Sequence, residues 1–175
     1  EVQSGIGRTG KWFGYQHEDI LPDVVTSAKA LGNGVPIGAC LARGIAATIL
    51  SPGTHGSTFG GNPLACSAAL AVLDVMNEKN LLERSRLLGN FFATAFQRKL
   101  ASRNEVIEVR GKGLMVGIEL DRPCGELVKI CSSRGVLINV AAQNVVRLLP
   151  PLIISDDQAT EIVENVSASI FDFLD

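Results

Sequence analysis

The sequence predicts a globular protein of mixed helices and strands, organised in two regions of residues 1–80 and 81–175. The composition supports a packed core, because 46% of the 175 residues are hydrophobic and only 19% are charged. The first region places short apolar runs between glycine-rich loops, whereas the second alternates helical and strand patterns. This change of pattern places a boundary near residue 80 and predicts an α+β unit for the second region.

The first region opens with a polar, glycine-rich loop over residues 1–20. The elements expected next are two short strands and a short helix, over residues 23–28, 36–42 and 46–50. A long loop over 51–63 then ends in Asn62-Pro63, a pair typical of a helix start. The helix expected over 64–77 is apolar on all sides, so we expect it to be buried.

The second region alternates helices and strands. The expected elements are a helix over 81–102, two strand runs within 106–120, a helix over 125–134, strands over 136–140 and 145–149, and a final helix ending at 174. The two runs within 106–120 flank Gly111-Lys112-Gly113, which predicts a turn and favours a hairpin. Ser155 precedes the last helix and is expected to cap it.

Charge and composition argue against several function classes. The net charge is -2 and aromatic residues make up only 5%, which disfavours a nucleic-acid-binding surface. No apolar run reaches the roughly 18 residues of a membrane span. The four cysteines lack the CxxC spacing of zinc sites, so we expect no metal and reduced thiols, as in a cytoplasmic protein.

Lys29 is the only charged residue in the stretch "TSAKALGNGVPIGA" of residues 26–39. A lysine in a loop is most often a solvated surface charge. Here it follows an apolar run and precedes several glycines, which would let a flat ligand approach the backbone. Burial in such a site would lower the pKa of the amine and make it a nucleophile toward a carbonyl cofactor. Lys29 is therefore the first candidate for a catalytic residue.

Three separated stretches together resemble the class III pyridoxal-phosphate (PLP) aminotransferases: "EVQSGIGRTG" at the start, the stretch around Lys29, and "GSTFGGNP". They occur in matching order and spacing, and the resemblance extends over essentially the whole chain. It implies an α/β protein of fold-type I. Residues 1–80 would be the C-terminal part of the large PLP-binding domain, with its mostly parallel sheet. Residues 81–175 would form the small C-terminal α+β domain.

The same resemblance implies roles for individual residues. Lys29 would bind PLP covalently and act as the general acid–base. Gln3 would hydrogen-bond near the phenolic oxygen of the cofactor. Thr58 would bind the phosphate across a homodimer interface, and Ser57 would contact substrate in the same partner site. A hydroxyl in a glycine-rich loop that leads into a helix suits an anion, which agrees with the role implied for Thr58.

Arg147 is a charged residue in an otherwise apolar strand pattern. A charge at a strand edge or a structural ion pair would explain it. We favour a functional explanation, in which its planar guanidinium binds a carboxylate of the substrate, or a glutamate that gates substrate choice.

The activity that the resemblance implies is transamination in arginine biosynthesis. The side-chain amine of N-acetylornithine would pass to 2-oxoglutarate, giving N-acetylglutamate semialdehyde and glutamate. Members that use ornithine, succinylornithine or 4-aminobutyrate are alternatives, and so is a non-catalytic module for folding or interaction. These substrates are small molecules, so neither nucleic acid nor membrane is an expected partner.

The chain begins at Glu1, whereas the family carries an aspartate for the ring nitrogen of the cofactor immediately before the Glu-Val-Gln stretch. The N-terminal phosphate contacts, the aromatic residue that stacks on the ring and the main substrate-carboxylate arginine are also absent. We therefore expect a C-terminal fragment with little or no transaminase activity by itself. Exposed sheet edges and apolar surface should accompany such a truncation.

Overall fold

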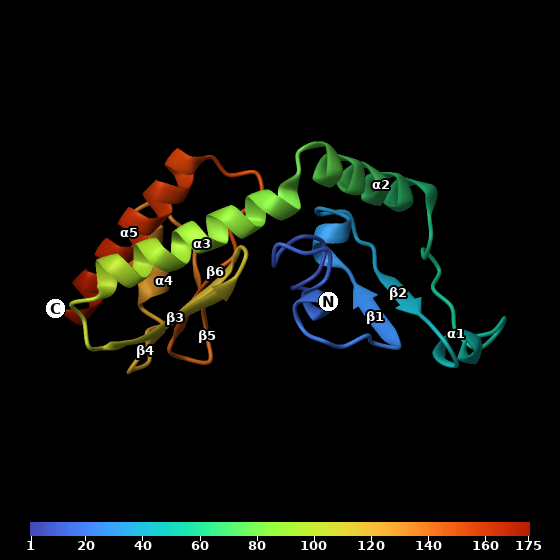
Figure 1. Cartoon of the computed structure of the whole chain (residues 1–175), viewed down its shortest axis with the longest axis horizontal. Coiled ribbons are helices and arrows are strands. Elements are labelled where there is room, and N and C mark those ends of the chain that lie inside the picture. Colours follow the sequence, from blue (N-terminus) through green and yellow to red (C-terminus); the bar gives the residue numbers. More distant parts are fainter. The chain divides into compact units, whose positions relative to one another are not determined.

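The computed structural model describes all residues, 1–175, and divides them into two compact units, Glu1–Glu83 and Arg84–Asp175. Each unit contains its own sheet (Figure 1). No helix is both long enough and apolar enough to cross a bilayer.

The first unit is built from short elements around one long helix. They are η1 (Gly14–His17), β1 (Val24–Ser27), η2 (Lys29–Leu31), β2 (Ala39–Ala42), α1 (Ala46–Ile49) and α2 (Pro63–Glu78). The strands predicted over 23–28 and 36–42 and the helix after Asn62 are all present, with β2 shorter than expected. The second unit begins within α3 (Leu81–Leu100), which starts three residues before the division.

The two strands of the first unit pair antiparallel, from Val24 opposite Ala42 to Ser27 opposite Ala39. The parallel pairing expected of the large-domain sheet is therefore not formed within this chain. Only residues 28–38 separate the strands, and that segment makes tight turns. A parallel pair needs a crossover of about a dozen or more residues, most often a helix.

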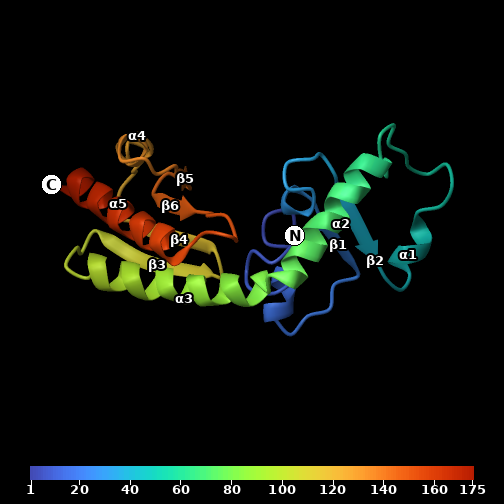
Figure 2. The ribbon, with the colours of Figure 1, turned by 90° about the horizontal axis from the view of Figure 1, so that it is seen from above.

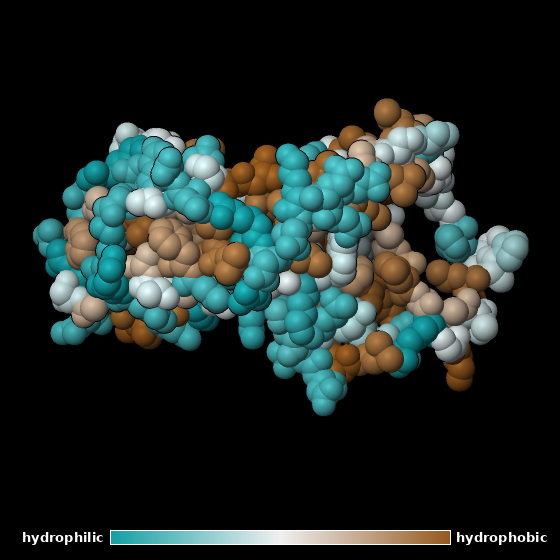
Figure 3. All heavy atoms as spheres, turned by 45° about the horizontal axis from the view of Figure 1, so that its top comes forward, coloured by the Kyte–Doolittle hydropathy of each residue, from teal (hydrophilic) through white to brown (hydrophobic).

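Helix α2 begins as predicted, because the Asn62 side chain accepts a 2.9 Å hydrogen bond from the backbone N–H of Ala65 and Pro63 occupies the first turn. The expectation that this helix is buried is wrong for this chain. Only Ala65, Ala69 and Met76 are buried, whereas Leu64 is 75% exposed. One stripe of two alanines and a methionine packs within the unit, and several of the remaining apolar side chains, such as Leu64 and Leu70, are exposed. Figure 3 shows such apolar side chains on the surface of the first unit.

The second unit combines α3 with a four-stranded sheet and two further helices. They are β3 (Val106–Lys112), β4 (Met115–Leu120), α4 (Leu127–Ser133), β5 (Asn139–Ala141), β6 (Val145–Leu148) and α5 (Asp156–Leu174). The strand order is β3-β4-β6-β5, and all neighbours are antiparallel. The predicted β3–β4 hairpin is confirmed, with Gly113 and Leu114 in the turn and Lys112 still in β3.

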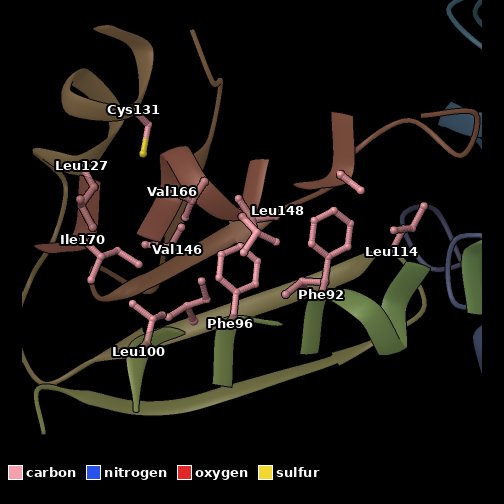
Figure 4. Packing of buried hydrophobic residues seen from close by; sticks show 14 of the residues in the cluster. Phe92, Phe96, Leu100, Leu114, Leu127, Cys131, Val146, Leu148, Val166 and Ile170 are labelled. Atoms are coloured by element: carbon pink, nitrogen blue, oxygen red, sulfur yellow. The ribbon is translucent and has the colours of Figure 1, made fainter. Parts of the chain in front are cut away.

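One apolar core fills the second unit (Figure 4). Alternation along β4 and β6 sends Ile118 and Val146 into the core, and α3 contributes Phe92 and Phe96, all fully buried. Helices α3 and α5 lie over this sheet in Figure 2. The cap predicted at Ser155 is confirmed, because its hydroxyl accepts a 3.1 Å hydrogen bond from the backbone N–H of Gln158.

Candidate functional site

Lys29 opens the η2 turn with a backbone φ of +44°, in the left-handed region. The Lys29 side chain has a Cβ and makes no hydrogen bond to the nearby backbone. This conformation is therefore costly, and such strained residues are typical of functional positions. Two backbone bonds hold the turn, from Leu31 N–H to the Ala28 carbonyl at 3.0 Å and from Gly32 N–H to the Lys29 carbonyl at 3.2 Å. Leu31 is buried, but Lys29 itself is exposed, so the burial expected for it does not occur within this chain.

A second tight turn follows Lys29 directly and explains the glycines. The backbone N–H of Val35 donates a 3.0 Å hydrogen bond to the Gly32 carbonyl. The two central residues, Asn33 and Gly34, have φ of +46° and +108°, as in the turns that favour Asn and Gly. A Cβ on Gly32 would lie 2.1 Å from the Val35 carbonyl oxygen, so no other residue fits there. These turns fold residues 29–35 back on themselves and leave the Lys29 side chain outside.

The segment that carries Gln3 is closed by the carboxylate of Glu1. This carboxylate accepts hydrogen bonds from the Ser4 hydroxyl and from the backbone N–H groups of Gly14 and Tyr15, the latter two at 2.9 Å. Partial burial raises the pKa of the Glu1 carboxyl, but these hydrogen bonds and the charge of the N-terminal amine together outweigh it, so the pKa lies below its ordinary value. Gln3 is exposed between Glu1 and Ser4. Figures 1 and 2 show this N-terminal segment beside the η2 turn.

Ser57 and Thr58 lie in the loop before α2, where every residue from 51 to 61 is exposed. The loop is ordered locally, because Gly60 N–H donates to the Ser57 carbonyl at 3.3 Å and the Asn62 side chain donates to the Phe59 carbonyl at 2.9 Å. Phe59 is 81% exposed although it is a large aromatic residue. The loop therefore presents two hydroxyls and an aromatic ring outward, as a surface that contacts another molecule would.

Arg147 lies on β6, which is an inner strand of its sheet and not an edge. Its neighbours across the sheet are Gly117 on β4 and Asn139 on β5. Val146 and Leu148 point into the core, so the half-buried Arg147 belongs to the opposite face. It borders an open hollow of about 560 Å³ that Gln158 and Glu161 of α5 also line. A guanidinium beside an open hollow suits a carboxylate ligand.

The five predicted site residues divide between the two units. Gln3, Lys29, Ser57 and Thr58 belong to the first unit, and Arg147 belongs to the second. The sequence did not predict that Glu1 closes the segment that carries Gln3. The glycines at positions 5 and 14, which both lie close to Glu1, were the one sequence feature that could have indicated it.

The cysteines form no disulfide, since all four are free thiols. Cys124 and Cys131 lie in the core, where burial raises the pKa of each thiol. Cys40 is exposed and Cys66 is half-buried, so only two of the four are core residues as expected. No group of three or more potential metal ligands gathers anywhere in the structure.

The exposed donors of the first unit suit the groups of an aldehyde phosphate such as PLP. Lys29 offers an amine for the aldehyde and Gln3 an amide for a ring oxygen. Thr58 offers a hydroxyl for a phosphate, in the loop expected to serve a partner subunit. These groups lie on turns and loops, which commonly carry functional residues on a more rigid scaffold.

The family comparison agrees with this chemistry, because residues 1–170 match the family of class-III aminotransferases. The chain is 52% identical to an acetylornithine aminotransferase of Nitrosomonas europaea over 175 residues, which is 100% of this chain and 44% of that protein. It is 56% identical to acetylornithine aminotransferase 1 of Bordetella pertussis, over 99% of this chain and 44% of that protein. The chain thus spans less than half the length of these relatives.

Solved structures give the same result. The crystal structure of acetylornithine aminotransferase from Elizabethkingia anophelis matches 99% of this chain and 45% of its own, with a TM-score of 0.90 and 40% identity. An ornithine aminotransferase from Toxoplasma gondii, described with partial occupancy of PLP at its active site, matches 99% of this chain and 42% of its own, with a TM-score of 0.93 and 34% identity. These matches confirm the predicted fold class as part of a PLP aminotransferase fold. From its sequence, its fold and its donor groups together, this chain belongs to the class-III aminotransferase family.

Proposed function

We propose that the complete enzyme containing these residues is a PLP-dependent aminotransferase of the cytoplasm that transfers the side-chain amine of N-acetylornithine to 2-oxoglutarate. The products are N-acetylglutamate semialdehyde and glutamate, in arginine biosynthesis. Residues 1–80 serve as part of its cofactor-binding domain, and residues 81–175 serve as its small domain. The observation that carries the proposal is the exposed amine of Lys29, held on a left-handed residue that opens the first of two tight turns.

The identities favour this substrate over ornithine. The acetylornithine aminotransferases named above are 52%, 56% and 40% identical to the chain, whereas the ornithine aminotransferase structure is 34% identical. Ornithine is the second candidate, because its enzyme matches the fold with a TM-score of 0.93. Succinylornithine and 4-aminobutyrate are further candidate amine donors, to be tested beside these two.

In this mechanism PLP supplies an electron sink for the substrate carbon that carries the reacting amine. The Nζ atom of Lys29 would hold the cofactor through its aldehyde, and as the general acid–base it would take the proton from that carbon and later return one. The Gln3 amide hydrogen-bonds near the phenolic oxygen and fixes the orientation of the ring. Arg147 binds a carboxylate with its planar guanidinium, which orients the substrate.

The loop with Ser57 and Thr58 acts in the second subunit of a homodimer. Thr58 donates its hydroxyl to the phosphate there, and Ser57 contacts the substrate. Support comes from the full exposure of this loop and from the outward-facing Phe59, which an interface would cover.

Reductive trapping of the complete enzyme tests this function. Borohydride treatment in the presence of PLP should attach the cofactor to the peptide that contains Lys29, and mass spectrometry locates it. Lys29→Ala should abolish the adduct, whereas Lys11→Ala, which removes another exposed lysine of the same unit, should keep it. An adduct on a different lysine would refute the assignment. A panel of N-acetylornithine, ornithine, succinylornithine and 4-aminobutyrate with 2-oxoglutarate then identifies the amine donor.

A further inference from the structure

We propose that Glu1 is a positioning residue whose carboxylate fixes the backbone of Gln3 at the cofactor site. This inference rests on the proposed function of Gln3. Glu1 itself is expected to touch neither cofactor nor substrate, because its carboxylate is directed at three donors of its own unit.

The hydrogen bonds of Glu1 close the segment on both sides of Gln3. Its main-chain carbonyl accepts a 3.0 Å hydrogen bond from Gly5 N–H, and its carboxylate accepts the hydroxyl of Ser4. Residues 1–5 therefore form a single closed turn with Gln3 near its centre. Since Glu1, two residues before Gln3, and Ser4 and Gly5, directly after it, are held, the backbone of Gln3 has little freedom, while its side chain stays exposed.

The same carboxylate anchors this turn to a segment farther along the chain. Its two oxygens accept the N–H groups of Gly14 and Tyr15 at 2.9 Å, which are the first two residues of η1. The first N–H groups of a helix have no partner within it, and a carboxylate is their best acceptor. Phe13, the residue before η1, provides no side-chain cap of its own. Glu1 thus links the Gln3 turn to η1 through the first two N–H groups of that helix.

Two glycines allow this arrangement. A Cβ on Gly5 would lie 2.8 Å from the Glu1 carbonyl oxygen and 3.1 Å from the Glu1 Cβ. A Cβ on Gly14 would lie 3.1 Å from Oε2 of Glu1 and 3.2 Å from the Cβ of Ser4. Neither glycine has a positive φ, so close packing against Glu1 accounts for both of them.

The site requires a carboxylate and not merely a side chain of that size. All three partners are donors, so each needs an acceptor, and a carboxylate offers only acceptors. In Glu1→Gln, the amide NH2 would face at least one of these donors. The lowered pKa of Glu1 agrees with an ionised group at neutral pH.

The test compares Glu1→Gln, Gln3→Ala and the double variant in the complete enzyme. The readouts are PLP affinity by fluorescence titration and the pH at which the visible absorption of the bound cofactor changes. If Glu1 acts through Gln3, each single variant weakens PLP binding about 3- to 10-fold and shifts that pH in the same direction. The double variant is then no worse than Gln3→Ala alone, because coupled residues are not additive.

Controls separate positioning from general stability. Glu18→Gln changes an exposed carboxylate of the same unit that makes no side-chain hydrogen bond in the structure, and it should leave both readouts unchanged. Ser4→Ala removes only one of the three hydrogen bonds and should give a smaller shift in the same direction, which keeps the test usable if Glu1→Gln folds poorly.

The proposal is overturned if the effects of Glu1→Gln and Gln3→Ala add, or if Glu1→Gln lowers the melting temperature without moving the absorption pH. It stays distinguishable from the proposed function. If the unmodified enzyme is not labelled at Lys29, the function fails; if it is labelled but Glu1→Gln leaves PLP affinity and absorption unchanged, only this inference fails.

Discussion

The backbone N–H of Leu114 donates a 3.3 Å hydrogen bond to the hydroxyl of Ser85, and both residues are fully buried. This bond joins α3 to the turn of the β3–β4 hairpin. One helical turn after Ser85, Gly89 meets Gly113 of the same hairpin so closely that a Cβ on Gly89 would lie 2.4 Å from the Gly113 carbonyl oxygen. The hairpin is thus packed backbone to backbone against the helix, and its second strand, β4, pairs with β6, with Gly117 opposite Arg147.

Gly89→Ala should destabilise the second unit although alanine is the better helix former. Helix propensity favours the change by about 1 kcal/mol. Overlap with the Gly113 backbone costs about 1–3 kcal/mol or more, because backbone atoms cannot move aside as a flexible side chain can. The cost of the clash should exceed the gain in helix propensity. Denaturant unfolding should therefore show a lower free energy of unfolding for Gly89→Ala than for the wild type.

Gly125→Ala is the matched control, since a Cβ added at Gly125 would have nothing within 4 Å and the φ of this residue is not positive. Its effect should stay within about 0.5 kcal/mol. Equal effects of the two substitutions would show that the close approach of α3 to the hairpin does not limit stability.

Phe96→Ala should cost the second unit about 3–5 kcal/mol, because it deletes a fully buried ring and leaves a cavity in a packed core. Phe96 stacks on Phe92 with ring centroids 6.0 Å apart, so the loss includes that aromatic contact. Phe91→Ala, in the same helix, removes a ring that is 39% exposed and should cost about 1 kcal/mol. A chemical denaturation series measures both, and similar losses would contradict the assigned core.

Much of the second unit could be predicted from local patterns. The amphipathic period of α3 and α5, the Ser155 cap and the alternation along β4 all agree with the packing that forms, so local and global preferences point the same way. The turn of the hairpin was displaced from Gly111 toward Leu114, because the buried Ser85 and the close contact with Gly89 select which residues reach the helix. The position of the turn therefore depends on tertiary contacts, which cannot be predicted from the pattern of the two strands alone.

The first unit was less predictable, for two physical reasons. Its strands are four residues long, and their antiparallel pairing depends on the turns of Lys29 and Gly32 and not on a periodic pattern. The prediction that α2 is buried was wrong for this chain. An apolar sequence indicates that a helix packs against other protein surface, but it does not indicate which segment provides that surface. The candidate site residues came from a resemblance carried by motifs, whereas the hydrogen bonds of Glu1 required coordinates.

The stability contributed by Glu1 should depend on pH in a defined direction. Its pKa in the folded chain is lowered from the ordinary value of 4.5, so the folded state binds the proton less readily than the unfolded state. This contribution is complete above 4.5 and is lost as pH falls through the lower, folded-state pKa. The difference in melting temperature between the wild type and Glu1→Gln should therefore be largest at neutral pH and shrink in acid. A difference that grows on acidification would contradict the hydrogen bonds assigned to Glu1.

Replacements of Lys29 should reveal a conformational cost at the site. Because the residue has a φ of +44°, Lys29→Gly should be more stable than Lys29→Ala by roughly 1 kcal/mol, since only glycine adopts this region without Cβ strain. At the next residue, which is not left-handed, the order should reverse: Ala30→Gly should lose about 0.5–1 kcal/mol. Thermal unfolding of the three variants measures both differences. The opposite signs at adjacent positions would establish that the strain belongs to Lys29 alone, whereas glycine destabilising at both positions would remove the backbone argument for its role.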